Sequence, residues 1–202
     1  MTRSVKIWMA GCATLATAAC GGDNGNHRGG TLLESLAPAE WADAAAKFVD
    51  THGHETGHVV LTNAPGAGVL LRLDVQELSE GWHGVHLHQI GDCSDAADGF
   101  KASGGHINPD GNAHGLLNPD GRKRANLPNI YAGADGRATA EFFNDTVALF
   151  PSEAAAAEVG PHPLLDDDGF AVIIHQNADD HKSQPIGGTG PRVACAAVIR
   201  AP

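Results

Sequence analysis

Aromatic side chains are scarce in this chain of 202 residues, which has one tyrosine, three tryptophans and six phenylalanines. Basic side chains are also few: 13 lysines and arginines face 24 aspartates and glutamates, for a formal net charge of −11. An acidic protein repels the phosphate backbone, which argues against a nucleic-acid partner. Long apolar runs are absent too, because nothing after residue 20 is long and apolar enough to cross a membrane.

The first 20 residues have the pattern of an export signal. Arg3 and Lys6 precede an apolar stretch over residues 7–19 that is too short to span a bilayer. The small residues before Cys20 (TAAC) are typical of a bacterial lipoprotein signal, although Thr17 stands where leucine is usual. Ordinary cleavage nearby is the alternative. We expect a periplasmic or cell-envelope protein with a lipid anchor on Cys20.

Cysteine is limited to four residues, and only Cys93 and Cys195 lie outside the signal. Two cysteines in an oxidising compartment suggest one disulfide, with two free thiols as the alternative. Residues 21–44 begin with GGDNGNHRGG and predict a flexible tether, and residues 31–48 could instead hold a short helix. Residues 45–202 remain for one globular domain.

Glycine, in contrast, is abundant at 26 residues, and short apolar runs alternate with Gly, Pro, Asn and Asp. This texture predicts an all-β domain. The clearest strand is 69–78, where the apolar Val69, Leu71, Leu73 and Val75 alternate with Leu70, Arg72, Asp74 and Gln76. Further strands are expected at 56–62, 137–143, 171–175 and 193–199. Residues 89–130 show almost no periodicity, and a loop of that length predicts a functional segment.

Five histidines fall in or beside these segments. His86 and His88, in GVHLHQ, are two apart and share one face of a strand, so both imidazoles can reach one ion. His106 and His114 lie in the long loop, and His175 ends the strand AVIIH. Neutral imidazoles suit copper(II), which also ranks highest in affinity among the divalent metals. We therefore expect a copper site.

At these residues the sequence closely resembles the copper/zinc superoxide dismutases in their bacterial exported form. The matching pieces are GWHGVHLHQIGDCS, ASGGHINPDGNAHG, NLPNI, IIHQNADDHKSQPIGG and GPRVACAAVI. They stand in the family's order and spacing, over about residues 45 to 200. The resemblance implies a flattened eight-stranded Greek-key β-barrel, of immunoglobulin-like sandwich architecture, with long active-site loops.

The resemblance also implies roles for single residues. The copper ligands would be His86, His88, His106 and His175, with His106 bridging copper and zinc and able to carry a proton. Arg192 would attract the superoxide anion, with Lys182 as a further candidate or a plain surface lysine. Asp179 would link a copper histidine to a zinc histidine, and Cys93 would pair with Cys195.

The zinc site departs from the family pattern of three histidines and one aspartate. His106 and His114 match, but Lys123 and Asn126 occupy the other two positions. A protonated lysine and a neutral amide are poor zinc ligands, so zinc binding is doubtful and we expect a copper-only site. One member of the basic run Arg122–Arg124 could pair with Asp179 instead, or the run is a solvated loop. Rescue by Asp110 or Asp120 is a further alternative.

Two functions follow from this pattern. The first is copper-dependent dismutation of superoxide to dioxygen and hydrogen peroxide outside the cytoplasm. The alternative is a copper-binding or buffering relative with little activity, but a mere carrier has no need of Arg192.

A homodimer is possible, with Trp82 either a surface contact or an isolated aromatic. His52, His54 and His58 form either a surface metal cluster or a polar turn, and the pattern favours the turn. His83 is expected to hold a backbone carbonyl.

Overall fold

The computed structural model describes residues 42–151 and 160–200, and it is almost entirely β-structure. The export signal predicted over residues 1–20, its Cys20, and the tether up to residue 41 lie outside the described residues. Within them, the strands are β1 (Ala44–Asp50), β2 (Glu55–Ala64), β3 (Gly68–Val75), β4 (Gly81–His83), β5 (Val85–His88), β6 (Ile130–Ala132), β7 (Ala138–Asn144), β8 (Val147–Ala148), β9 (His162–Pro163), β10 (Phe170–His175) and β11 (Arg192–Val198). Two short 3-10 helices, η2 (Ala96–Asp98) and η3 (Lys101–Ser103), lie between β5 and β6.

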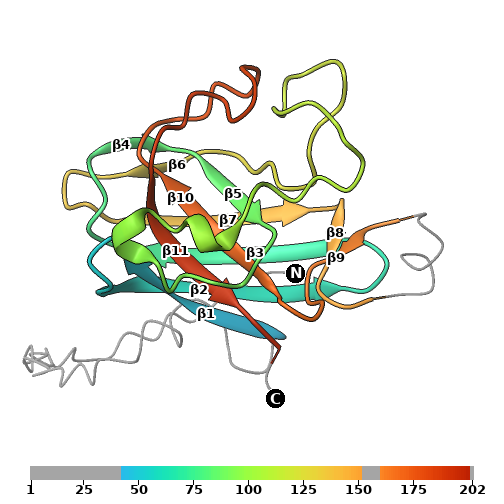
Figure 1. The fold of residues 1–202 in the computed structure, drawn as a ribbon, viewed down its shortest axis with the longest axis horizontal. Coiled ribbons are helices and arrows are strands. Elements are labelled where there is room, and N and C mark those ends of the chain that lie inside the picture. Colours follow the sequence, from blue (N-terminus) through green and yellow to red (C-terminus); the bar gives the residue numbers. More distant parts are fainter. Residues whose placement is uncertain (1–41, 152–159, 201–202) are drawn as a thin grey trace, which may run out of the picture.

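The strands form a curled antiparallel sheet in the order β5-β10-β11-β1-β2-β3-β7. A small ribbon of β4 and β6 joins the two edges, because β4 leads into β5 and β6 leads into β7 through the turn at Gly133–Arg137 (Figure 1). With β4 and β5 counted as one strand interrupted at Gly84, the barrel has eight strands, and the predicted fold is confirmed.

The first strand corrects one expectation. A short helix was an option for residues 31–48, yet residues 44–48 belong to β1, which pairs with β2 on one side and with β11 on the other. Alanine favours helices in isolation, but the backbone of this segment fills the gap between two strands of the sheet. The hydrogen bonds available there override the local preference.

The core fills the inside of the barrel and follows the alternation of the strands. In β3, Val69, Leu71, Leu73 and Val75 are all buried, as predicted, while Leu70 and Arg72 are half-buried on the other face. The largest fully buried side chains of this core are Phe48, Leu61, Leu71, Leu73, Leu87, Leu127, Leu149, Leu164, Phe170 and Ile174. Burying a side chain of this size contributes about 1.5–3 kcal/mol.

A second, smaller core lies on the outer face of β10 and β11. Ala171, Ile173 and Cys195 pack there against Phe100, which comes from the loop after β5. The predicted disulfide between Cys93 and Cys195 is present and pins this loop to β11, with the two Cα atoms 5.9 Å apart. Strand β10 is therefore buried on both faces, and its outer face lies under a fixed loop.

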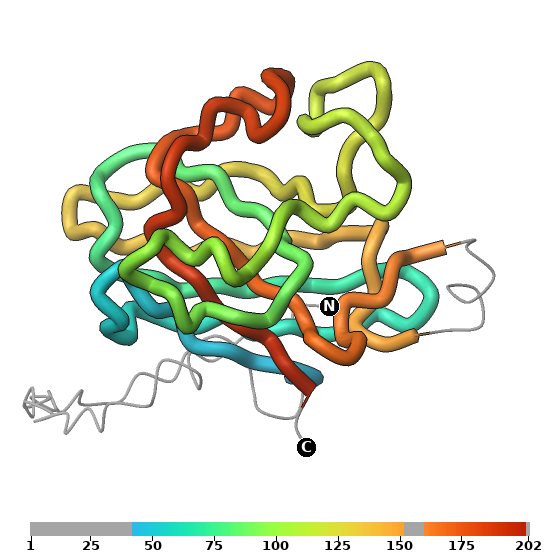
Figure 2. Tube along the Cα trace, in the orientation of Figure 1, coloured from blue at the N-terminus to red at the C-terminus, as the bar shows by residue number. Residues whose placement is uncertain are grey.

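Two long loops project from one end of the barrel and stand opposite each other. One follows β5 and runs to β6, and the other joins β10 to β11; they appear in yellow-green and in red at the top of Figure 2. These loops carry most of the residues that the sequence singles out. Among the described residues, no helix has the length and apolarity needed to cross a membrane.

A candidate copper centre

His86 and His88 lie on the outer face of β5, as the spacing predicts. Ile173 and Ala171 of β10 are their register partners, so the two imidazoles stand beside the outer face of β10. Their strand neighbours Val85 and Leu87 point inward to the barrel core. The period of two thus separates the metal face of the strand from its packing face.

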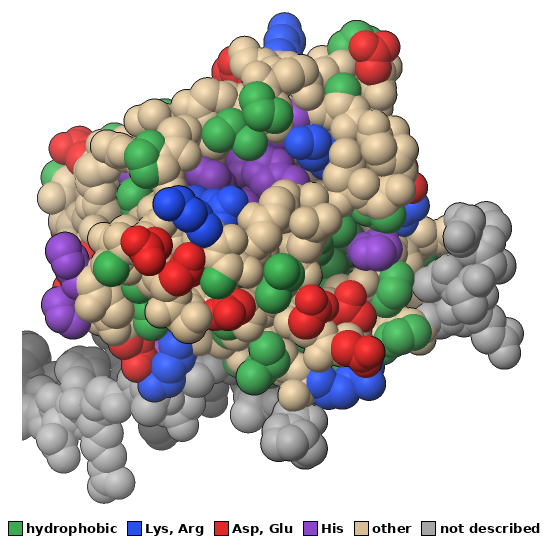
Figure 3. Space-filling model, viewed as in Figure 1, with side chains coloured by type: hydrophobic (Ala, Val, Ile, Leu, Met, Phe, Trp, Pro, Cys, Tyr) green, Lys and Arg blue, Asp and Glu red, His purple; other side chains and the backbone are tan. Residues whose placement is uncertain are grey.

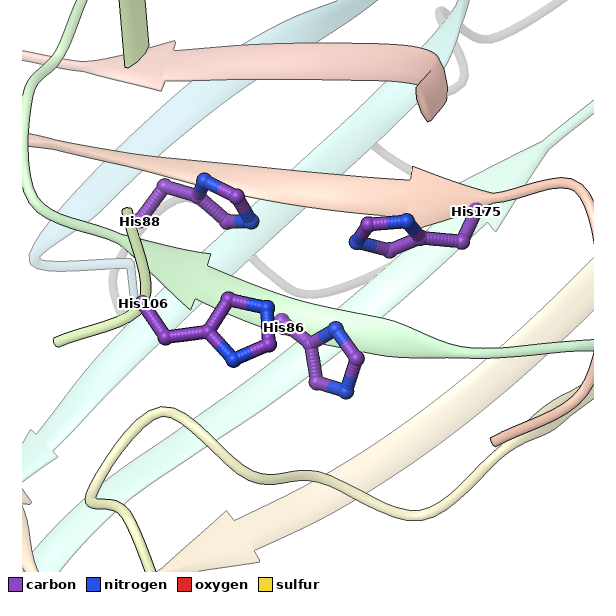
Figure 4. A group of neighbouring side chains, drawn as sticks. All are labelled: His86, His88, His106 and His175. Atoms are coloured by element: carbon purple, nitrogen blue, oxygen red, sulfur yellow. The ribbon is translucent and has the colours of Figure 1, made fainter. Parts of the chain in front are cut away.

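Two further histidines complete the cluster from other elements. His106 comes from the long loop, which runs beside β5 and forms a bridge with His88. His175 ends β10, where a register shift after Ile174 pairs it with Arg192 of β11. The four imidazoles face a common space (Figure 4), and one nitrogen from each lies within 4.8 Å of the others.

Each of three rings has one nitrogen fixed by the protein and one left without a partner. Asp179 holds His86 Nε2 at 2.7 Å, the Gly104 carbonyl holds His88 Nδ1 at 3.0 Å, and the Gly190 carbonyl holds His175 Nδ1 at 3.1 Å. The opposite nitrogens are buried and unpartnered, and so are both nitrogens of His106. Buried polar atoms are nearly always hydrogen-bonded, so this convergent unpaired set fits a copper ion.

The protonation of these rings also fits metal binding. Burial, with the nearby Arg192 charge, lowers the pKa of His88 to about 2. Burial and the neighbouring His86 lower the pKa of His175 to about 3, and burial likewise lowers the pKa values of His86 and His106. A lowered histidine pKa means a neutral ring at physiological pH, which is the form that binds a metal.

Arg192 is held beside the copper cluster. Its guanidinium donates to the Phe100 carbonyl, to Ser103 Oγ at 3.0 Å and to the Gly104 carbonyl at 2.8 Å. Gly104 is the same carbonyl that fixes His88 Nδ1, so the arginine and one copper ligand share an anchor. A positive charge fixed in this position can hold a small anion near the metal.

Asp179 links the copper cluster to His114. Its carboxylate receives His86 Nε2 at 2.7 Å, His114 Nε2 at 3.0 Å and the His181 amide at 2.7 Å. Burial opposes its charge, but these hydrogen bonds outweigh burial and lower the pKa of Asp179. The predicted link between the two histidines is therefore present as a charged, fully buried carboxylate.

The remnant of the zinc site is filled by protein contacts. Asn126 Nδ2 lies 2.9 Å from His114 Nδ1, and Asn126 Oδ1 accepts the Gly115 amide at 3.1 Å. Lys123 Nζ donates to the Pro185 carbonyl at 3.0 Å, and burial lowers the pKa of this lysine. These residues do not fit a tetrahedral zinc ion with four ligands.

Of the two alternatives for the basic run, pairing with Asp179 is wrong. Arg122 pairs with Asp145, and Arg124 pairs with Asp110 through two hydrogen bonds of 2.6 and 2.8 Å. Asp179 is already saturated by the two histidines and a backbone amide. Asp110 is committed to Arg124, and within the described residues neither Asp110 nor Asp120 joins a metal-ligating group.

The structure also places the histidines that were not expected to bind the copper ion. His83 faces two backbone carbonyls, those of His175 at 2.7 Å and of Ser79 at 2.8 Å, which confirms its structural role. His52 and His54 are exposed in and beside a turn, while His58 is buried beside Glu55. The turn covers residues 51–53, whereas His58 belongs to strand β2. Trp82 is not isolated, because it meets Tyr131 edge-on.

Sequence reasoning missed the residues that bring the loops together. A Cβ on Gly187 would lie 1.7 Å from Asp179 Oδ1, and a Cβ on Gly84 would lie 2.5 Å from Thr189. Ser103, fully buried, and Gln184 were also missed. Glycines are so common in this chain that their positions alone gave no signal, and Ser103 and Gln184 act through contacts far apart in sequence.

A curled β-barrel with four convergent histidines and a fixed arginine defines a copper redox protein. The family profile of copper/zinc superoxide dismutase matches residues 55–198. The chain is 46% identical to a superoxide dismutase [Cu-Zn] of Caulobacter vibrioides over 158 residues, which is 78% of this chain and 84% of that protein. The chain therefore belongs to the copper/zinc superoxide dismutase family.

Solved structures agree. A SOD-like protein from Bacillus subtilis superimposes with a TM-score of 0.68 and 28% identity, over 76% of this chain and 96% of the other. The Cu/Zn superoxide dismutase from Brucella abortus superimposes with a TM-score of 0.54 and 28% identity, over 76% of this chain and 97% of the other. The barrel is thus that of the family.

Proposed function

We propose that the protein is a copper-dependent superoxide dismutase that converts superoxide to dioxygen and hydrogen peroxide. The observation that carries this is the set of four convergent imidazoles whose unpartnered nitrogens are buried, next to a fixed Arg192. A bound copper ion would supply one-electron redox chemistry, alternating between two oxidation states. Family membership and the name of the Caulobacter relative support the same reaction.

The residues of the chain bring the anion to the metal. The histidines lie in a hollow near the top of Figure 3, with Lys and Arg side chains (blue) beside it, while acidic side chains gather lower on this face. In a protein with a net charge of −11, a local positive rim is needed to attract superoxide. Arg192 is charged at every physiological pH and holds the anion near the metal. His106, whose two nitrogens are both free of protein partners, can bind through one and carry a proton on the other.

The test is superoxide consumption by the copper-loaded protein, compared with an Arg192→Ala variant. We expect fast turnover in the parent and a drop of about tenfold or more in the variant, with copper content unchanged. The parent rate should also fall as ionic strength rises, because salt screens the attraction. One bound copper with negligible turnover would place the protein among copper-binding or buffering relatives instead.

We further propose that the protein works in the periplasm or cell envelope, held by a lipid on Cys20. The signal-like segment at residues 1–20 and the Gly/Asn-rich residues after it support this location. The Cys93–Cys195 disulfide fits an oxidising compartment. A Cys20→Ala variant should move from the membrane fraction to the soluble fraction, and retention in the membrane fraction would contradict the lipid anchor.

We also propose a homodimer that uses the β4–β6 ribbon. Trp82 and Tyr131 are opposite each other on this ribbon, 58% and 49% exposed, with ring centroids 5.2 Å apart. Exposed aromatic pairs are typical of association surfaces. Sedimentation of the parent should show a dimer, and Trp82→Ser should shift it towards the monomer. A parent that sediments as a monomer at all concentrations would rule out this arrangement.

A further inference from the structure

We propose that this chain has replaced the zinc ion of its family with a metal-free lock, made of His114, Asn126, Lys123 and Gln184, and binds no zinc between His106 and His114. The lock concerns zinc binding, whereas the proposed reaction takes place at copper. Zinc binding is therefore tested separately from superoxide turnover.

The first step is the hydrogen bonding of His114, which is fully buried. Its Nε2 faces the Asp179 carboxylate at 3.0 Å, so Nε2 carries the proton and Nδ1 has only a lone pair to offer. The amide of Asn126 lies 2.9 Å from Nδ1. Its orientation is fixed by the Gly115 amide, which donates to Asn126 Oδ1, so the NH2 group points at the imidazole. The one lone pair that zinc could use is taken.

The second step is that few ligands for zinc are available around His114, because the two candidate ligands that lie closest to it, His86 and Asp179, are hydrogen-bonded to each other. Asn126 stands at the aspartate position and offers no charge, and Lys123 stands at a histidine position with an ammonium group. The ammonium is turned to the Pro185 carbonyl, and its positive charge acts on His106. A cation in this place repels zinc and supplies one positive charge where the family has a divalent ion.

The third step is that the two loops are joined without any metal. Gln184 accepts the His114 amide at 2.9 Å and donates to the His114 carbonyl at 2.9 Å. Asn129 makes the same kind of double contact with the backbone of Asp179, both at 2.8 Å. The Leu117 amide donates to the His181 carbonyl at 3.1 Å. Protein hydrogen bonds thus hold the loops that a shared zinc would otherwise hold.

The experiment measures zinc retained by the full exported protein. The copper site is filled first with one equivalent of copper, then zinc is added in excess, the sample is desalted, and both metals are counted by mass spectrometry. We expect one copper and no zinc at His114. Zinc that is retained by the parent but lost in a His114→Gln variant would overturn the proposal. Zinc that the His114→Gln variant also retains is bound elsewhere in the protein, and this outcome agrees with the proposal.

A reversal variant tests which side chains close the site. The double change Lys123→His with Asn126→Asp restores the family's ligand types, and we expect it to retain one zinc per chain. Its matched control is Arg122→His with Asn112→Asp, which puts the same donor types on the same loop at side chains that face the Arg122 carbonyl and Asp145 and do not contact His114 Nδ1; it should retain none. Failure of a folded reversal variant to take up zinc would count against the roles of Lys123 and Asn126.

A measurement on the unmodified chain guards against misfolding of the variants. In a ¹⁵N spectrum of the copper-free protein in its disulfide-bonded form, His114 should show an unprotonated Nδ1 and a protonated Nε2. Zinc bound to the four copper histidines can reach His114 only through the shared Asp179, so His114 Nδ1 should keep the chemical shift of a nitrogen without metal. A chemical shift of His114 Nδ1 typical of a zinc-bound nitrogen would overturn the proposal without any variant.

Discussion

At the scale of single residues, Asp179 is the most connected side chain of the site. Its carboxylate fixes His86, which faces copper, and His114, which faces the lock. Replacing it by asparagine removes the charge and one acceptor, so one histidine loses its orientation. We expect Asp179→Asn to weaken copper binding by about tenfold to a hundredfold, the usual effect of losing a residue that orients a metal ligand. Competitive titration with a copper chelator measures this change.

The control for that variant is the adjacent Asp180→Asn. Asp180 is exposed, and its carboxylate accepts hydrogen bonds from the backbone amides of Lys182 and Ser183 and from the Ser183 side chain, which an asparagine oxygen can also accept. Copper affinity in this control should equal that of the parent. Equal losses in both variants would mean that the negative charge of the loop, and not the orientation of His86, decides copper binding.

Lys123 offers a second prediction at this scale. Its single hydrogen bond to Pro185 joins the two long loops, and a half-buried charged hydrogen bond contributes about 1 kcal/mol. We expect Lys123→Ala to lower the melting temperature by about 2–4 °C and to speed copper release. Lys182→Ala, an exposed lysine on the neighbouring loop, is the control and should change neither property. An unchanged melting temperature and an unchanged rate of copper release in Lys123→Ala would show that this contact does not stabilise the two loops.

The copper ligands were predictable from sequence because strand periodicity and the family motifs fix their faces. The fate of the basic run was not, since Arg122, Lys123 and Arg124 point in three directions that only the fold decides. Asn126 was recognised as a poor zinc ligand. Its bond to His114 depends on the loop running beside β5, where Asn126 bridges to His86.

At the scale of elements, the loop between β10 and β11 reaches the site only because Gly187 has no side chain. Its φ is +64°, and a Cβ there would overlap Asp179 Oδ1 at 1.7 Å and approach His114 Nε2 at 2.8 Å. Gly187→Ala must therefore push the loop away from the carboxylate. We expect a loss of about 3 kcal/mol or more of unfolding free energy and weaker copper binding, from strain and from broken buried hydrogen bonds.

Gly188→Ala is the matched control for this substitution. Gly188 has a similar φ of +71°, but nothing lies within 4 Å of the Cβ position. It therefore bears the same backbone strain of about 1 kcal/mol without the overlap. Chemical denaturation of both variants separates the two causes. An equal loss of unfolding free energy in both variants would mean that the overlap with Asp179 does not destabilise Gly187→Ala.

The strands differ in how well the sequence predicted them. Strands with alternating burial, such as β7, were predicted to within one residue at each end, because one face meets the core and the other does not; the strand predicted over 69–78 ends earlier, at Val75. β1 was not, since its run of alanines carries little periodic signal and it becomes a strand only between β2 and β11. The two-residue strands β8 and β9 are distant from each other in the sequence and pair in parallel, so no local sequence pattern predicts them.

At the scale of the whole molecule, the copper cluster makes the metal-free protein sensitive to acid. The pKa of His88 falls to about 2 and that of His175 to about 3 on folding, whereas both rings titrate near 6.5 in the unfolded chain. The unfolded state therefore binds more protons as pH drops below about 6.5. By linkage, this stability is complete above that pH and is lost progressively as pH falls towards the folded-state values.

We accordingly expect the melting temperature of the copper-free, disulfide-bonded protein to fall steadily between pH 7 and pH 5, a window above the usual titration range of carboxylates. A His88→Gln variant removes one of the rings that the unfolded state protonates, so its melting temperature should fall less steeply over the same window. Copper binds only the folded state and should raise the melting temperature at pH 7. Calorimetry at matched ionic strength measures all three curves. A melting temperature that is flat across the window in the copper-free parent would mean that His88 and His175 take up protons in the fold as readily as in the unfolded chain, and that burial does not hold these rings neutral.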